Sequence, residues 1–155
     1  MADLIWYYQL YIGTSLTAAG ILLLLSLYAW RHRTVIAATG FFLVMTVSWG
    51  WMLFAALELI PQALPLKSFF NNIRFSFSLG LPFTAFITLM QFTGHTTWLQ
   101  PRRLVLVALT PCLGLLLVWT NSLHHLLWRD YVVVPVGTLL IPVRLYGWWY
   151  YVNTS

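Results

Sequence analysis

The feature that most constrains this chain is a long stretch without charge at its start. No charged residue lies between Asp3 and Arg31. A helix crosses the hydrocarbon core of a bilayer with about 20 apolar residues, so this stretch is long enough to span a membrane with some tilt. A cleaved signal peptide begins with basic residues and ends in small ones. This stretch instead begins with Asp3 and ends with Trp30 and Arg31. We therefore predict a permanent transmembrane helix over about residues 4–30.

The composition of the whole chain extends this conclusion. Among 155 residues, charged residues make up 7% and hydrophobic residues 61%, whereas a soluble domain carries about 25% charged residues. A soluble fold of this composition would leave large apolar surfaces in water, which excludes that class. The length leaves room for about four to six spans. We predict an all-α integral membrane protein with a single transmembrane domain over residues 1–155 and four transmembrane helices at about 4–30, 34–60, 69–92 and 104–119.

The tail over residues 120–155 has a different character. It contains polar residues and is interrupted by proline and glycine, so we predict an interfacial segment on the outer membrane surface and no fifth span. Two short β-branched runs within it, 131–134 and 138–141, are compatible with a hairpin or a re-entrant segment. Tryptophan is enriched at the headgroup level of membranes. We therefore expect four residues of this region to act as interface anchors: Trp119, Trp128, Trp148 and Trp149.

The few charges also predict the topology. Two pairs of arginines, Arg31 with Arg33 and Arg102 with Arg103, lie in loops on one side of the predicted membrane. Basic loops are retained on the cytoplasmic side, which places both termini on the outer side of the cell (inner) membrane. Because the basic residues are spread between apolar runs, the net charge of +5 does not indicate nucleic-acid binding. Cys112 is the only cysteine in the sequence, which excludes an internal disulfide.

Two charges fall where membrane topology alone does not explain them. Glu58 lies near the end of the second predicted span and Arg74 near the start of the third. An ionisable group beside the hydrocarbon is costly unless it is paired or hydrated, so we predict that these two side chains pair. The pair has two interpretations. It is either a structural ion pair that fixes how the two helices align, or the polar floor of an outward-facing ligand pocket.

The segment after the fourth span holds a second group of polar residues, Asn121, His124 and His125. If the segment is helical, it lies on the outer surface with one apolar face towards the membrane. Its polar side chains then either hydrogen-bond within the interfacial layer or contribute to a ligand pocket. Adjacent histidines point about 100° apart on a helix, which is a poor arrangement for two ligands of one metal.

No pattern in the sequence indicates a cofactor or a reaction. His32 and His95 lie in predicted loops, whereas haem-ligating histidines are usually held within packed helices. The sequence contains no glycine-rich phosphate loop, no Ser-His-Asp set and no paired carboxylates. We therefore expect no bound cofactor or metal and no enzymatic activity in this chain.

Several short motifs occur in a fixed order along the chain. They are 57–59 (Leu-Glu-Leu), Lys67, 69–73 (Phe-Phe-Asn-Asn-Ile), Pro82, 92–94 (Phe-Thr-Gly), Pro111, 119–121 (Trp-Thr-Asn), the pair His124-His125, Trp128 and 146–149 (Tyr-Gly-Trp-Trp). In this order they resemble the N-terminal seven-helix (7TM) sensor region of membrane histidine kinases, over about its first four helices and the outer segment that follows. The resemblance implies a helical region that lies ahead of cytoplasmic signalling domains and receives an extracellular or membrane-borne signal.

The resemblance favours a membrane-embedded sensor or input module without a catalytic domain. The sequence has no phosphoacceptor histidine box and no nucleotide-binding domain, so we expect either a fragment of a longer sensor or a shortened relative. In this hypothesis the antiparallel helices contact the lipid bilayer and other transmembrane helices or subunits, and they bind a small molecule that the sequence does not identify. We expect its pocket to lie near Glu58, Arg74, Asn121, His124 and His125.

Two other functions are considered. The first is a small accessory transmembrane subunit of a larger membrane complex, with a structural or assembly role. Several small residues in the spans suit helix-helix assembly and are consistent with it. The second is a transporter or channel, which the sequence disfavours because no predicted span carries a recurrent polar face.

Overall fold

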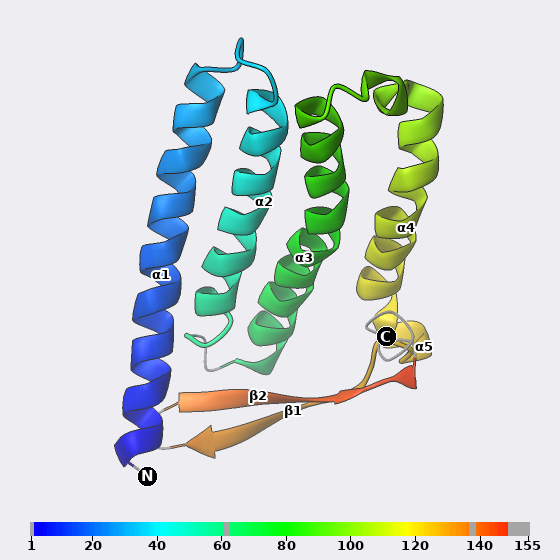
Figure 1. Ribbon diagram of the computed structural model, residues 1–155. Helices are drawn as coiled ribbons and strands as arrows, with labels where there is room; N and C mark the ends of the chain where they lie inside the picture. Colours follow the sequence, from blue (N-terminus) through cyan, green and yellow to red (C-terminus); the bar gives the residue numbers. More distant parts are fainter. Residues whose placement is uncertain (1, 61–62, 137–138, 149–155) are drawn as a thin grey trace.

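A computed structural model describes residues 2–60, 63–136 and 139–148 of the chain. In this part of the chain, four long helices lie side by side in chain order, and successive helices run in opposite directions (Figure 1). Each is long and apolar enough to cross a membrane, which confirms the predicted class of helical membrane protein. They are α1 (Ala2–Arg31), α2 (Ala38–Leu57), α3 (Leu64–Phe92) and α4 (Pro101–Trp119).

The start of α3 differs from the sequence prediction in a way that affects the site. We expected the third span to begin near residue 69, but α3 begins at Leu64. Pro65 lies in its first turn, where a missing backbone N–H costs nothing because that group has no partner within the helix. Lys67, which the sequence placed between two spans, is therefore a residue of α3.

Small and polar side chains hold the first three helices together. Between α1 and α2, the hydroxyl oxygens of Ser26 and Thr46 lie 2.7 Å apart. Between α2 and α3, the backbone N–H of Gly40 donates to Oε1 of Gln91 over 2.9 Å. Glycine lets two helix backbones approach closely, and Gly40 and Gly50 are both buried in this packing. α1, α2 and α3 therefore form one packed unit.

A hairpin lies across one end of the bundle (Figure 1). Its strands are β1 (Trp128–Val136) and β2 (Leu139–Tyr146), which pair antiparallel with Val132 opposite Val143. The sequence was compatible with a hairpin or a re-entrant segment here, and the segment forms the hairpin. Its tip, 137–138, lies outside the described residues. We call this end of the molecule the hairpin end.

The opposite end carries the loops between α1 and α2 and between α3 and α4, together with the 3-10 helix η1 (Thr96–Leu99). Two arginines there lie against tryptophan rings. The guanidinium carbon of Arg33 is 4.8 Å from the ring centre of Trp30, and that of Arg103 is 5.0 Å from Trp98. We call this end the arginine end.

A small apolar core joins α3, α4 and the hairpin. Val118, Leu127 and Trp128 are buried in it, and Phe75 packs against them. The Trp128 ring meets that of Phe75 edge to face, with ring centres 4.9 Å apart. We expected Trp128 as an interface anchor, but it is only 5% exposed, because its ring packs against Phe75 of α3. It is thus a core residue.

The other three tryptophans of the tail remain predictions as interface anchors. Trp119 and Trp148 are 49% and 60% exposed, and the Nε1–H of Trp119 donates to the Ser76 hydroxyl over 3.2 Å. Trp149 lies outside the described residues. Exposure at the hairpin end is compatible with a place at the headgroup level.

We predict that Gly40→Ala destabilises the protein by about 1–2 kcal/mol, because an added Cβ would lie 2.7 Å from the backbone Cα of Thr88, which cannot move aside cheaply. Thermal unfolding in detergent measures the loss. The matched control is Gly20→Ala in α1, where an added Cβ has no neighbour within 4 Å. Alanine favours helix over glycine, so the control should be neutral or stabilising. Equal effects of the two substitutions would contradict the close approach of α2 and α3.

Candidate functional site

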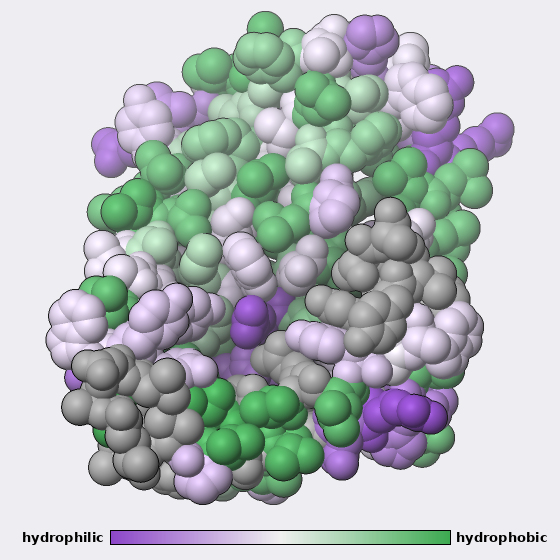
Figure 2. Space-filling model, turned by 60° about the horizontal axis from the view of Figure 1, so that its bottom comes forward, coloured by the Kyte–Doolittle hydropathy of each residue, from purple (hydrophilic) through white to green (hydrophobic). Residues whose placement is uncertain are grey.

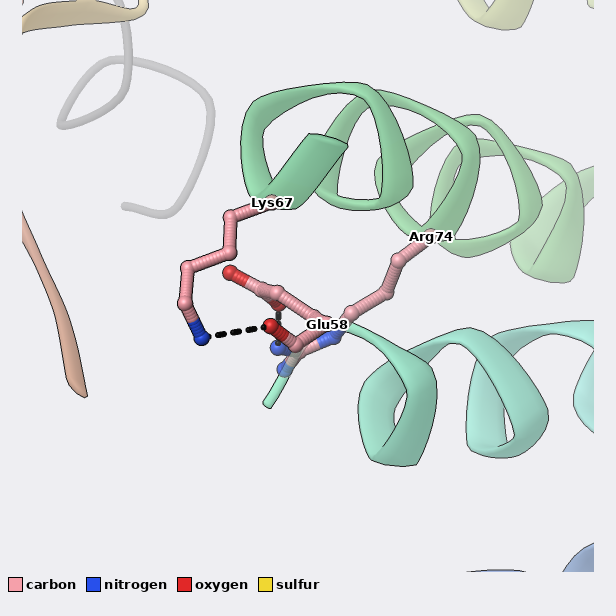
Figure 3. A network of polar contacts seen from close by, with 3 residues as sticks. All are labelled: Glu58, Lys67 and Arg74. Carbon is pink, nitrogen blue, oxygen red and sulfur yellow. Dashed lines mark hydrogen bonds and ion pairs between the residues drawn. The ribbon is translucent and has the colours of Figure 1, made fainter. Parts of the chain in front are cut away.

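The polar groups of the site gather where α2 ends and α3 begins. Glu58 follows the last residue of α2, and Nη1 of Arg74 on α3 donates to its Oε2 over 2.9 Å. Figure 3 shows Arg74 and Lys67 reaching from α3 towards Glu58. The predicted pairing of Glu58 with Arg74 is therefore confirmed. We call these three residues the α2–α3 junction.

Lys67 is the member of the junction that sequence reasoning missed. Its side chain is fully buried, and Nζ donates to the backbone carbonyls of Glu58 and Leu59 over 3.1 and 3.2 Å. The last carbonyls of a helix have no partner within it, and a positive charge is favourable there. Lys67 thus caps the end of α2 from the neighbouring helix. The spacing of Lys67 and Arg74, seven residues apart, places both on one face of a helix and was the available signal.

An unusual polar side chain lies between these two cations on the same face of α3. Asn71 is fully buried, and neither its Nδ2 nor its Oδ1 has a hydrogen-bond partner within the described part of the chain. Buried amides in proteins are nearly always bonded to protein groups or to ordered water. The face of α3 that bears Lys67, Asn71 and Arg74 is therefore a polar stripe with hydrogen-bonding capacity left over.

A cavity of about 340 Å³ opens beside the junction at the hairpin end. Three helices and one strand contribute to its wall, and Figure 2 shows a hydrophilic recess at the centre of this end of the molecule, above the apolar surface of the hairpin. We call it the hairpin-end cavity. Its lining residues are Tyr7, Tyr8, Tyr11, Ala55, Glu58, Leu59, Arg74, Ile141 and Tyr146.

The second predicted group of polar residues has a local structural role. Asn121 is 5% exposed; its Oδ1 accepts from the backbone N–H of Leu127 over 2.9 Å, and its Nδ2 donates to the carbonyl of Trp128 over 2.9 Å. His124 accepts at Nδ1 from the N–H of Leu126 over 3.1 Å. These bonds turn the chain from α4 into β1. The amphipathic helix expected over this segment is thus reduced to α5 (Asn121–His124).

We expected the two groups of polar residues to line one pocket, but the structure places them apart. Asn121 and His125 line a separate cavity of about 260 Å³, together with Asn72, Arg129 and Asp130. His124 is in neither lining set, and its Nε2 lies 3.1 Å from the Thr120 hydroxyl. Both Oδ1 and Nδ2 of Asn121 already form hydrogen bonds within its own turn, so few donors or acceptors of its amide remain for a ligand.

A third cavity, of about 710 Å³, lies between the middle parts of α3 and α4. Apolar side chains dominate its wall, and each helix contributes one proline, Pro82 and Pro111. A proline inside a helix removes one backbone hydrogen bond and bends the helix. Both prolines lie in the wall of this cavity.

The ion pair makes a prediction about stability. Replacing Glu58 with Gln and Arg74 with Gln, singly and together, should give losses that do not add, with a coupling of about 1–3 kcal/mol, because each single change already removes the whole ion pair. Unfolding in detergent measures the three losses. Arg102→Gln at the arginine end is the control and should cost little. Strictly additive losses would show that the two side chains do not stabilise each other.

Asn121 makes a second prediction. Asn121→Ala should destabilise the protein by about 2–3 kcal/mol, because it leaves the N–H of Leu127 and the carbonyl of Trp128 without a partner in a buried place. The neighbouring control, Ser122→Ala, changes an exposed side chain and should be nearly neutral. The loss would appear in thermal unfolding and in faster hydrogen exchange of β1. Unchanged protection of β1 would contradict the role of Asn121.

Comparison with known proteins identifies a family that this chain matches. A family model described as the N-terminal 7TM region of histidine kinase matches residues 14–155, which is most of the chain. The matched range includes α2, α3, α4, the hairpin and the junction residues. No curated protein and no solved structure is significantly similar. The chain therefore belongs to the family of N-terminal 7TM regions of histidine kinases.

Proposed function

We propose that this chain is the membrane-embedded input region of a histidine-kinase-type sensor and that it receives its signal at the hairpin-end cavity. Membership of the family supports the input region and favours it over the accessory-subunit hypothesis. The composition of the cavity wall is the observation that supports this cavity as the place where the signal is received. It includes Tyr11 from α1, Arg74 from α3 and Ile141 from β2, so an occupant would touch several elements at once.

This arrangement suits signal transmission. A ligand shifts a protein between two conformations only if it interacts differently with each. An occupant of the hairpin-end cavity would contact three helices and the strand that lies across their ends, so its free energy of binding depends on how those elements are placed. A change in helix position relative to the hairpin is the movement that such a ligand favours.

The charges support an orientation for the signal. Arg31, Arg33, Arg102 and Arg103 all lie at or near the arginine end, and basic segments beside spans are retained in the cytoplasm. The hairpin end then faces outward, towards an external or membrane-borne signal. The kinase reaction itself belongs in this proposal to a cytoplasmic domain outside these residues.

The proposal is tested on the full gene product that contains these residues. In native membrane vesicles with radiolabelled ATP, we expect phosphate to appear on the gene product or on a kinase that co-purifies with it. Tyr11→Ala, which alters the cavity wall, should change the level of phosphorylation about fivefold or more, as expected for a coupling of about 1 kcal/mol between two sites.

The matched control is Tyr28→Ala, which removes an exposed tyrosine from the other end of the same helix. It should leave phosphorylation unchanged at equal amounts of protein in the membrane. The proposal is wrong if neither the gene product nor any partner is phosphorylated, or if Tyr11→Ala and Tyr28→Ala behave alike.

A further inference from the structure

We infer that the hairpin-end cavity binds an anionic group, a phosphate or a carboxylate, through the guanidinium of Arg74. This inference names the ligand class for the cavity and rests on the proposed function only for its role in signalling. The chemical argument stands on the burial, charge and hydrogen-bonding capacity of the residues around the cavity.

The two members of the ion pair are not equally accessible. Glu58 is 1% exposed, whereas the side chain of Arg74 is 24% exposed, and both line the cavity. The glutamate side chain is thus almost entirely buried, and the arginine side chain is the accessible member of the pair. A ligand entering the cavity meets the positive member of the pair.

Arg74 has more hydrogen-bond donors than its ion pair with Glu58 uses. A guanidinium carries five N–H groups in a planar fork that matches the oxygens of a carboxylate or a phosphate. Within the described residues its recorded hydrogen bond is the one from Nη1 to Glu58. The remaining N–H groups are available to an oxyanion in the cavity.

The local charge also favours an anion. Glu58 and Arg74 are the charged residues of the cavity lining, and Lys67, which lies outside the lining, adds a second cation at the α2–α3 junction. Charge is poorly screened beside the hydrocarbon of a membrane. An anionic ligand would balance the excess positive charge, whereas a cationic one would increase it.

Three tyrosines of α1 complete the site. Tyr7, Tyr8 and Tyr11 line the cavity, and each carries a phenolic hydroxyl that can donate a hydrogen bond. Aromatic residues at this level are also expected as membrane-interface anchors. Here, however, they lie around the same space as the guanidinium, where each hydroxyl can donate to an oxyanion and each ring can cover the body of the ligand. The volume of about 340 Å³ suits a small molecule or a headgroup.

The anionic group has two possible sources with the same chemistry. It is carried either by a dissolved molecule that reaches the hairpin end or by a lipid whose headgroup lies there. A binding experiment separates them. The protein is purified in uncharged maltoside micelles at constant ionic strength. One arm titrates inorganic phosphate, and the other adds phosphatidylglycerol in phosphate-free buffer.

We expect saturable binding in at least one arm, measured by calorimetry or by a rise in Tm. Arg74→Gln should weaken it at least about tenfold, since it removes a charged hydrogen-bond donor. Arg74→Lys should weaken it less, because it keeps the charge and loses the planar fork. Arg102→Gln is the matched control and should bind as the unchanged protein does. Binding only to phosphate identifies a dissolved anion, binding only to phosphatidylglycerol identifies a lipid headgroup, and binding in both arms identifies the shared group.

Arg74→Gln removes the ion pair of Arg74 with the buried Glu58 and therefore risks misfolding. The double variant Glu58→Gln with Arg74→Gln removes both charges of the ion pair and provides a second protein that should not bind. The inference is overturned if neither arm shows binding, if binding survives in the double variant, or if choline chloride binds where both anionic probes fail. Binding is measured without any kinase. A failed phosphorylation test would therefore leave the anion-binding result valid, and a failed binding test would leave the phosphorylation result valid.

Discussion

The interaction on which the rest of this structure depends is the burial of charge at the end of α2. Glu58 and Lys67 are both withdrawn from solvent in a chain whose long helices are suited to a membrane. A buried charge without a partner is strongly unfavourable, and removing it from water is offset only by close hydrogen bonds. Glu58 therefore pairs with Arg74, and Lys67 bonds to the carbonyls of Glu58 and Leu59, the two residues that follow α2. These contacts hold the end of one helix against the start of the next.

A second set of contacts holds the hairpin against the helices. The side chain of Asn121 bonds to the backbone at the start of β1, and the N–H of Gly147 donates to the carbonyl of Leu127 over 2.7 Å. Any side chain at Gly147 would collide with the carbonyl of Leu126. The start of β1 and the residue after β2 are thereby tied together next to α5. This keeps the hairpin across the helix ends and closes one side of the hairpin-end cavity.

The proposed role follows from how these two sets of contacts meet. The junction holds α2 against α3, the Asn121 turn holds the hairpin, and the hairpin-end cavity is lined by residues of the junction, of β2 and of α1. A group bound there would contact α2 and α3, which the junction holds together, and the hairpin, which a separate set of contacts holds in place. In the proposed function, a ligand there would favour one placement of the helices over another.

The sequence by itself determined the class, the four spans and the need for Glu58 to pair with Arg74, because hydropathy and the cost of isolated charge near a membrane depend mainly on composition and order. Its errors have specific physical causes. Lys67 falls between the two predicted spans 34–60 and 69–92, whereas α3 already begins at Leu64 with Pro65 in its first turn. A tryptophan at a span end is equally compatible with lipid and with a core, so only packing against Phe75 showed that Trp128 is buried. Tertiary structure alone decided that Asn121 belongs to a turn and that the polar residues divide between two cavities, because hydrogen bonds depend on which backbone groups the fold brings within reach.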